Sequence, residues 1–392
     1  MTDAGATKVP DIPDEAVSRF FVSLACGTYL VGYAGYSFGD TLGSLRYLVY
    51  LAPLLLAASL MFQRTAMINR PAVAFLVAYL ALVLVGNIVG AKWGEYSLRD
   101  VVVISLIIFA FMPVINVSAA QINLLFVCSL IYLLMAYWTA GIENIRILQI
   151  LHEGTGSGFQ AGFDDNQGGL LGPLYAVFLQ AMGTKFQFGL ALLMSLLGGK
   201  RVGIAAILFG VAASIAFRNI GVLKPRRNRI VALLGVLTAI NLVALNLNSI
   251  SESAHQMLDL RVSIEEVMLG RFEIASQMSH AMDNRSLSES LFGFGPGSAD
   301  ALAVRVSDGV LTHPHNDWNK ILYDYGVAGS LIITAFMAVV FSTSATAAAI
   351  AVASATLMCT DNVLIYLFYQ FPLVLMVAYA APREPTARKV RQ

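Results

Sequence analysis

Long apolar stretches separated by short polar segments fill most of this chain. Many of them contain about 20 residues, the length of helix that crosses a hydrocarbon core of about 30 Å. Backbone polar groups in lipid must be satisfied within their own segment, so we expect each stretch to be an α-helix. The predicted helices lie near residues 20–37, 44–62, 71–90, 100–118, 121–141, 167–184, 186–198, 202–217, 230–248, 318–341, 345–358 and 363–381. The pattern predicts an all-α integral membrane protein with about twelve transmembrane helices.

The composition supports this prediction. Hydrophobic residues make up 57% of the chain and charged residues only 12%, whereas soluble domains carry about 25% charged residues. The net charge of +1 gives no indication of nucleic-acid binding. Cys26, Cys128 and Cys359 stand far apart in apolar surroundings, so we interpret them as small buried hydrophobic residues rather than disulfide partners or metal ligands.

Positive charges gather in alternate predicted loops. The strongest group is RNIGVLKPRRNR at 218–229, and the positive-inside rule places this loop and both chain termini in the cytoplasm. Residues 1–18 are acidic and contain proline, so we expect a short cytoplasmic tail and no cleaved signal peptide. The segments 186–198 and 345–358 are short for a transmembrane span. If either one does not cross the membrane, the predicted orientation of every later segment is reversed.

Two hydrophilic segments, 142–166 and 249–317, then fall on the outer side of the membrane, which in a bacterium is the periplasm. The longer one contains most of the polar residues outside the predicted helices. We find no internal repeat or linker, so residues 1–392 are interpreted as one polytopic membrane domain with a long periplasmic loop. Function is expected on this outer side.

The segment THPHNDWNKILYDYGVAGSLI, at 312–332, lies where the long loop returns to the membrane. Asn316 or Asp317 is the expected N-cap of the next helix, directly after His315. The partial positive charge of a helix N-terminus disfavours imidazolium, so a neutral His315 could accept a proton. The alternative is that His313 and His315 are interfacial residues with only a capping role.

Lys200 and Arg201 form a pair of cations in a predicted external turn, against the charge distribution of the rest of the chain. Such a pair suggests an anionic ligand, because arginine binds phosphate oxygens through two parallel hydrogen bonds. The alternative is that both side chains extend to lipid headgroups.

Residues 270–302 contain Arg271 and three glycines, Gly293, Gly295 and Gly297. The pattern at 260–278 predicts an amphipathic helix at the membrane surface. The glycines permit either a sharp turn or a close approach of the backbone to a ligand, and the turn is the favoured interpretation.

Several motifs are missing from the sequence. It contains no HExxH, Walker-type or dinucleotide-binding motif and no cluster of Cys and His. The middles of the predicted helices contain almost no Asp, Glu or Lys, which disfavours an ion-coupled transporter.

Taken in order, these segments resemble the O-antigen ligase and O-antigen polymerase superfamily of bacterial membrane glycan transferases. The matching signature consists of Arg271 in GRFEI, LFGFGPG at 291–297 and HPHNDWNKILYDYGVAG at 313–329. GFQAGFDDNQGG at 158–169 and SLLGGKRVG at 195–203 are similar to two further family segments.

The resemblance implies a C-type glycosyltransferase-like helical fold in the bacterial inner membrane, with an active site that faces the periplasm. The implied donor is a glycan linked to undecaprenyl pyrophosphate. The implied acceptor is a hydroxyl group of another glycan in the polymerases or of the lipid A core in the ligases. Membrane lipids are implied partners, whereas no nucleic acid, metal or other cofactor is implied.

The resemblance also implies roles for individual residues. His315 corresponds to the general base, and Arg201 and Arg271 would bind and neutralise the pyrophosphate. The further substrate contacts are Lys200, His313, Gly295 and Gly297. Whether Lys200 or Arg201 contacts the phosphate is left open, because GGKR replaces a simpler Ser-Arg turn.

Among these activities, polymerisation is favoured slightly over ligation, because the external loop is modest and shows no added surface for a lipid A core. A polymerase would have a chain-length regulator protein as a further partner. The alternative from another class is a multipass transporter or flippase of lipid-linked sugars. A third alternative is a structural membrane subunit, which would have no reason to bring Arg201, Arg271 and His315 into one cavity.

Overall fold

The computed structural model describes the greater part of the chain. The described residues are 14–37, 43–62, 68–89, 96–140, 166–198, 200–247, 249–250, 253 and 271–381. Within these ranges the structure is helical and contains no β-strand, only an isolated bridge between Ile68 and Pro113. The predicted all-α fold is therefore confirmed for the described part of the chain.

Every predicted apolar segment coincides with helix. The first half of the chain contains α1 (Asp14–Ser37), the 3-10 helix η1 (Gly43–Tyr50), α3 (Leu51–Phe62), α4 (Arg70–Val89), α5 (Ser97–Ala110) and α6 (Ala119–Ala140). The segment predicted at 100–118 ends early, at Ala110, and Pro113 follows in an irregular stretch. Proline lacks the N–H that would continue a helix, which accounts for the early end.

The second half contains the remaining apolar helices. They are α8 (Asn166–Met182), α9 (Lys185–Leu197), α10 (Arg201–Asn219), α11 (Arg226–Leu245), α17 (Asp317–Phe341), α18 (Ala345–Leu357) and α19 (Leu367–Ala380). Two short 3-10 helices, η4 (Gly221–Leu223) and η5 (Val363–Ile365), connect some of them. The last predicted segment, 363–381, is thus divided into η5 and α19.

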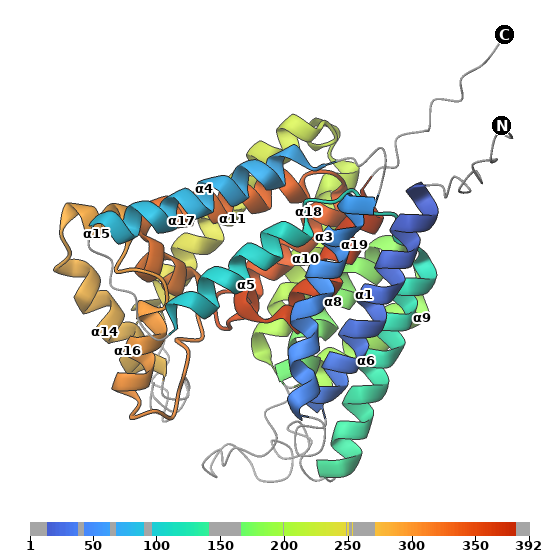
Figure 1. Ribbon diagram of the computed structural model, residues 1–392, viewed down its shortest axis with the longest axis horizontal. Helices are drawn as coiled ribbons and strands as arrows, with labels where there is room; N and C mark the ends of the chain where they lie inside the picture. Colours follow the sequence, from blue (N-terminus) through green and yellow to red (C-terminus); the bar gives the residue numbers. More distant parts are fainter. Residues whose placement is uncertain are drawn as a thin grey trace, which may run out of the picture.

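The helices form two groups that meet along α5, α10 and α18 (Figure 1). In one group α1 packs against η1, α3 and α6, and α8 packs against α9 and α10. In the other, α17 packs against α4 and α11. Helix α18 lies between the groups, because it contacts α8 and α10 on one side and α11 and α17 on the other.

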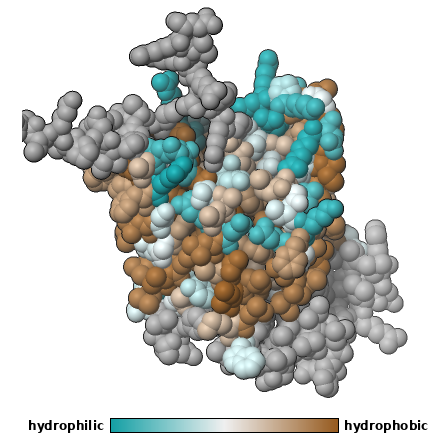
Figure 2. Space-filling model, turned by 90° about the vertical axis from the view of Figure 1, so that its right-hand side faces the viewer, coloured by the Kyte–Doolittle hydropathy of each residue, from teal (hydrophilic) through white to brown (hydrophobic). Residues whose placement is uncertain are grey.

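The outer surface is apolar enough for a membrane. Among the described residues, six helices are long and apolar enough to cross a bilayer. These segments are Glu15–Gly35, Gly43–Phe62, Arg70–Ile88, Val202–Asn219, Arg226–Leu245 and Asp317–Phe341. Figure 2 shows hydrophobic side chains over the middle and lower part of one face, with hydrophilic side chains gathered toward its upper end. The structure therefore supports a helical membrane protein, while the number of spans and their orientation stay predictions.

Part of the predicted external loop is folded. It contains α14 (Arg271–Asp283), α15 (Leu287–Phe292) and α16 (Ser298–Val306), which lie beside the first part of α17 (Figure 1). A small core holds them to α17; its buried members are Ile274, Met278, Ala299, Ala303 and Tyr323. Helix α14 overlaps the last part of the amphipathic helix predicted at 260–278, whose residues 260–270 lie outside the described part of the chain.

Glycines allow this folded segment to approach α17 closely. Gly293 has φ +77, and a Cβ there would lie 2.4 Å from the backbone of Asp324. Gly326 has φ +64, interrupts the helical geometry of α17, and would place a Cβ 2.5 Å from the backbone of Leu291. Only glycine fits such contacts. The predicted turn at 291–297 is therefore confirmed, and it packs backbone against backbone.

Candidate functional site

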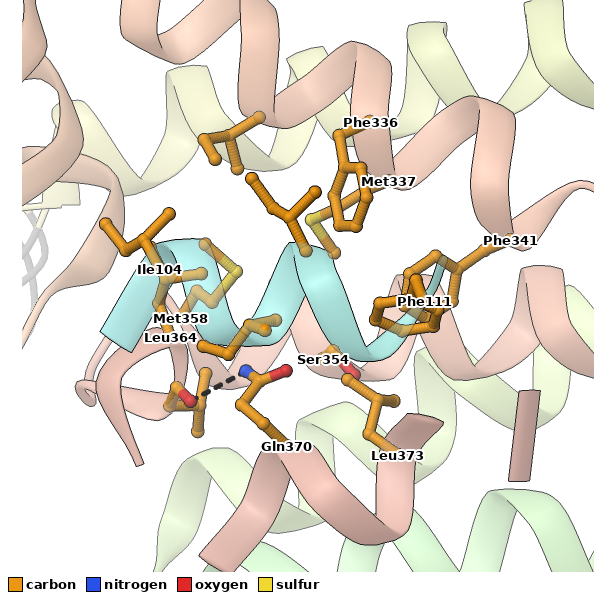
Figure 3. Close-up of a pocket in the computed structure, with 14 residues that line it drawn as sticks. Ile104, Phe111, Phe336, Met337, Phe341, Ser354, Met358, Leu364, Gln370 and Leu373 are labelled. Carbon is orange, nitrogen blue, oxygen red and sulfur yellow. Dashed lines mark hydrogen bonds between the residues drawn. The ribbon is translucent and has the colours of Figure 1, made fainter. Parts of the chain in front are cut away.

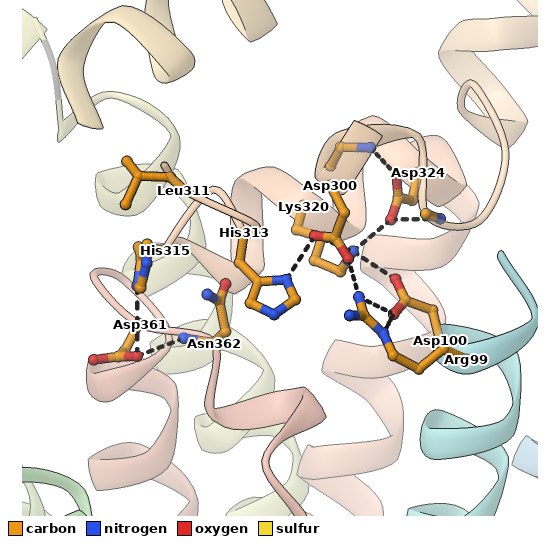
Figure 4. Close-up of polar contacts among 12 residues, drawn as sticks. Arg99, Asp100, Asp300, Leu311, His313, His315, Lys320, Asp324, Asp361 and Asn362 are labelled. Carbon is orange, nitrogen blue, oxygen red and sulfur yellow. Dashed lines mark hydrogen bonds and ion pairs between the residues drawn. The ribbon is translucent and has the colours of Figure 1, made fainter. Parts of the chain in front are cut away.

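Two polar clusters lie next to each other at the beginning of α17 (Figure 4). We call the first the Asp361 cluster; it consists of Lys200, His315 and Asp361. We call the second the Lys320 network; it consists of Arg99, Asp100, Asp300, His313, Lys320 and Asp324. The two histidines of the HPHN motif therefore belong to different clusters.

The beginning of α17 is fixed by side chains of the same motif. Asn316 is the N-cap, since its side chain accepts a hydrogen bond of 3.0 Å from the backbone N–H of Asn319. Its amide also donates to the carbonyl of Ala244 in α11 at 3.2 Å. Trp318 donates from Nε1 to the carbonyl of Ala355 in α18 at 3.0 Å. Neighbouring helices on two sides thus hold the beginning of α17, directly after His315.

Asp317 connects the same point to the segment after α18. Its backbone N–H donates to the carbonyl of Met358 at 2.9 Å, and its Oδ2 accepts from the backbone N–H of Leu364 at 2.7 Å. These two bonds bracket residues 358–364. They place Asp361 beside His315, although the two residues are far apart in sequence.

Asp361 is the centre of its cluster. Its Oδ2 forms an ion pair with Lys200 Nζ, and its Oδ1 lies 3.9 Å from His315 Nδ1. Burial raises the pKa of the Asp361 carboxyl, but the contacts with His315 and Lys200 outweigh burial and hold that pKa below its usual range. Asp361 is therefore a carboxylate, which can orient the imidazole of His315 and stabilise it when protonated. The side chain of His315 is 13% exposed, so the cluster reaches the surface.

A glycine of α8 gives Lys200 its path to Asp361. A Cβ at Gly169 would lie 2.6 Å from Cγ of Lys200, so a larger residue there would displace the lysine. Gly169 ends the 158–169 segment, and Lys200 lies in the 195–203 segment. The structure thus brings together residues from three of the segments that carry the family resemblance, at 158–169, 195–203 and 313–329.

The two arginines of the sequence prediction are placed only by their backbones. Arg201 is the first residue of α10, directly after Lys200, and Arg271 is the first residue of α14. Their side chains lie outside the described part of the structure. The expectation that Arg201, Arg271 and His315 line one cavity therefore stays a prediction.

Lys320 is the centre of the second cluster. Its Nζ lies 2.5 Å from Asp100 Oδ2, 3.0 Å from Asp300 Oδ1 and 3.1 Å from Asp324 Oδ2. Arg99 contacts Asp100 at 3.0 Å and also pairs with Asp300. The three carboxylates are fully buried, and the Lys320 side chain is 2% exposed. The network joins α5, α16 and α17.

His313 belongs to this network, because its Nδ1 lies 3.2 Å from Asp300 Oδ1. Burial raises the pKa of the Asp300 carboxyl, yet Lys320, His313 and Arg99 together lower it to about 2. Asp300 is therefore ionised and holds the HPHN segment to α16. This geometry favours a structural role for His313.

Asp324 anchors the glycine turn. Its carboxylate accepts hydrogen bonds from the backbone N–H groups of Gly297 at 3.2 Å and Ala299 at 2.7 Å, at the beginning of α16. Its backbone carbonyl accepts from Gly295 at 3.0 Å. A Cβ at Gly297 would also lie 2.7 Å from the backbone of Tyr96. Gly295 and Gly297, predicted as substrate contacts, thus face protein backbone in this structure.

An apolar cavity lies deeper in the molecule, between α5, α17, α18 and α19 (Figure 3). Its volume is about 30 Å³, and side chains such as Ile104, Phe336 and Leu373 line it. A single water molecule needs about 10–15 Å³ of such space. The cavity therefore has no room for a sugar or a pyrophosphate. The Asp361 cluster is therefore the better candidate for chemistry.

Sequence reasoning did not single out Asp361 or the carboxylates around Lys320. One signal was present for the network: Lys320 and Asp324 are four residues apart at the start of an apolar helix, which is the spacing of an ion pair on one helix face. Asp361 gave a weaker signal, as a lone carboxylate between two apolar segments. Its importance follows from the bonds of Asp317, which no sequence pattern specifies.

No protein-family model and no curated protein sequence matches this chain. The described residues form a helical structure in which six helices are long and apolar enough to cross a membrane, and an Asp–His–Lys cluster lies at the beginning of α17.

Proposed function

We propose that this chain is a membrane glycosyltransferase that needs no metal and moves a glycan from an undecaprenyl-pyrophosphate donor to an acceptor hydroxyl. The product would be polymerised O-antigen or exopolysaccharide repeat units, or O-antigen attached to the lipid A core. The observation that supports this proposal best is the meeting of Lys200, His315 and Asp361 at one point. The proposed location is the bacterial inner membrane, with cytoplasmic termini and a site that faces the periplasm.

His315 is the proposed general base. As the acceptor oxygen forms its bond with the anomeric carbon, His315 takes the proton of that hydroxyl. The bond between the anomeric carbon and the phosphate oxygen breaks, and its electron pair leaves with undecaprenyl pyrophosphate. Asp361 keeps the imidazole oriented and stabilises the imidazolium that forms, in the manner of the carboxylate of a catalytic triad.

The cluster also favours one choice between the adjacent cations. Lys200 is paired with Asp361 and is only 10% exposed, so its charge is already neutralised. Arg201 follows at the N-terminus of α10, where backbone N–H groups and the helix dipole favour an anion. Arg201 is therefore the proposed first phosphate ligand, with Arg271 as the second, because guanidinium groups can bind the pyrophosphate at two oxygens.

Polymerisation stays slightly favoured over ligation. The folded part of the outer segment consists of three short helices packed closely on α17, among the residues that the structure describes. Such a small unit offers little surface for a lipid A core. A chain-length regulator protein would then be the expected partner.

The decisive experiment is transfer by purified protein in proteoliposomes that contain lipid-linked glycan isolated from the host strain. We expect longer or acceptor-linked glycans from the wild type, and large losses in Arg201→Ala and Arg271→Ala. Arg271→Lys should also be impaired, because lysine keeps the charge but lacks the planar fork. Arg227→Ala, which alters an exposed arginine of α11, is the control. Full activity of both Arg201→Ala and Arg271→Ala would refute the proposed role of the arginines.

One observation favours a second candidate, a flippase of lipid-linked sugars. The Lys320 network buries charged groups where the outer segment meets the beginnings of α5 and α17, and buried charges often mark a transport pathway in membrane proteins. A flippase would move a labelled lipid-linked sugar between leaflets and would form no new glycosidic bond. Leaflet exchange without transfer in the same proteoliposomes would therefore select this candidate.

A further inference from the structure

Asn362 has an unusual environment beside the candidate site. It is fully buried, and its backbone is satisfied: its N–H donates to Asp361 Oδ1 at 2.9 Å, and its carbonyl accepts from Ile365 at 3.2 Å. Its side-chain Oδ1 and Nδ2, however, have no hydrogen-bond partner in the part of the chain that the structure describes. Burying an unpaired polar group costs about 1–3 kcal/mol. Folding alone would therefore favour an apolar residue at this position.

The unpaired amide lies next to the proposed base. Figure 4 places Asn362 between His313 and His315, directly after Asp361 in the chain. Asp317 adds a second unpaired group: its Oδ2 is bonded to Leu364, but its fully buried Oδ1 has no partner among the described residues. The hydrogen bond from Leu364 to Asp317 ties this carboxyl group to the segment that carries Asn362, and Asn362 directly follows Asp361, the ionic partner of His315.

The segment 308–315 leads directly into His315 and α17. Asp308 and His315, at its two ends, have φ of +50 and +53, and Gly309 has φ +84. Residues other than glycine rarely adopt positive φ, and such strain gathers at functional sites. Leu311, in the middle of the segment, lies beside His315 in Figure 4. Rotation at Asp308 and His315 would move the segment relative to His315 and would give a ligand access to the buried groups beside it.

We propose that Asn362 and Asp317 bind hydroxyl groups of the acceptor sugar when this segment moves, and that they place the attacking hydroxyl at His315. This inference rests on the proposed function. An amide offers a donor and an acceptor, which match two neighbouring hydroxyls of a sugar, and the carboxyl oxygen accepts a further hydroxyl. The donor pyrophosphate needs cations and is bound separately, by the arginines.

The position of the acceptor also decides which nucleophile reacts. With a sugar held by Asn362, its oxygen bonds to the anomeric carbon, its proton passes to His315, and the phosphate oxygen leaves with the electron pair. A water molecule at the same point would hydrolyse the donor by the same steps. Loss of Asn362 should therefore weaken acceptor binding without removing the slow hydrolysis of the donor.

The test compares Asn362→Leu, which keeps the size of the side chain and removes its polarity, with the wild type. Lipid-linked glycan from the host strain serves as donor, and the glycan released from it by mild acid serves as soluble acceptor at varied concentration. We expect the acceptor KM to rise at least tenfold, with unchanged release of undecaprenyl pyrophosphate to water and equal or higher thermal stability. Asn87→Leu, on α4, is the control, because the amide oxygen of this half-buried residue is also buried without a partner among the described residues, whereas its Nδ2 donates to Val83.

Two results would overturn the proposal in distinguishable ways. Normal transfer by Asn362→Leu with an unchanged acceptor KM would show that the amide holds only ordered water, while the proposed function stands. A wild type that neither transfers glycan nor releases undecaprenyl pyrophosphate would remove the proposed function, and the acceptor site with it.

Discussion

His313 and His315 are separated by one proline, yet they belong to regions of opposite character. His313 contacts a network in which Lys320 reaches three carboxylates and Arg99 reaches two of them. His315 contacts Asp361, whose other ionic partner is Lys200, and buried groups next to it are unpaired among the described residues. The dense network fixes the position of helices, whereas the sparse cluster retains groups that can bind and react. The two regions contain similar types of residue. They differ in how many of their charged and polar side chains are paired.

Removing each histidine in turn tests this contrast most strongly. Loss of a general base lowers a rate by about 10²–10⁴-fold, so His315→Ala should nearly abolish glycan transfer while the protein still inserts and binds the lipid donor. His313→Ala should retain most of the turnover rate and mainly lower thermal stability. Initial rates and melting temperatures of both variants in the same detergent provide the measurement. Equal losses of rate would show that the two clusters act as one.

Lys320→Met tests the structural side of the comparison. The substitution leaves Asp100 and Asp300 with Arg99 and leaves Asp324 without a lysine or arginine partner among the described residues. Breaking a buried ion pair in this way destabilises by about 3–5 kcal/mol. We expect a clearly lower melting temperature and poor yield from the membrane.

The control for this variant is Lys224→Met, at an exposed position before α11, which should melt like the wild type. Adding Asp300→Asn to Lys320→Met removes one of the three buried carboxylates that lost Lys320 and should recover part of the stability. No recovery in the double variant would contradict the network as described.

Acid should weaken the network in a defined pH range. The ordinary pKa of an aspartate is 3.8, and that of Asp300 is lowered to about 2 in the folded protein. Its ionised form therefore stabilises the fold above pH 3.8, and this stabilisation, roughly 2 kcal/mol, is lost as the pH falls through about 2. Unfolding measured between pH 5 and pH 2 should show this loss in the wild type and a shallower slope in Asp300→Asn. An identical slope in both would contradict the assignment.

The smallest expected effect is that of a chelator. Because arginines neutralise the pyrophosphate in the proposed mechanism, transfer should continue in excess EDTA. Inactivation by EDTA that Mg²⁺ or Mn²⁺ reverses would show that a metal, rather than Arg201 and Arg271, carries out the neutralisation. The measurement is the transfer rate before and after chelation in the same proteoliposomes.

The sequence predicted the helices well, since the length of an apolar run is a local property. Helix ends were less accurate where a single residue decides them, as at Pro113 after α5. The sequence pattern did not predict the outer helices, except for part of α14. Their core is small and draws its residues from three helices, so no single helix shows a long apolar pattern. In the site, the N-cap and the turn glycines could be predicted from local rules.

Asp361 and Asn362 could not be predicted, because their role depends on hydrogen bonds between distant segments. The bonds of Asp317 to Met358 and Leu364 bring these residues to the HPHN motif, and nothing in the sequence near position 361 reveals that pairing. The same holds for Arg99 and Asp100, which reach Asp300 and Lys320 only because α5 packs against the outer segment.

The break at Gly326 divides α17 into two mechanical parts. The outer part follows directly after His315 and includes Lys320 and Asp324 of the Lys320 network. The backbone carbonyls of Tyr323 and Asp324 accept hydrogen bonds from the backbone N–H groups of Phe294 and Gly295 in the glycine turn. The inner part, from residue 327 to 341, faces the core and the lipid. Any side chain at position 326 would collide with the backbone of Leu291. A single methyl group there would therefore separate the outer part of α17 from the glycine turn that Asp324 anchors.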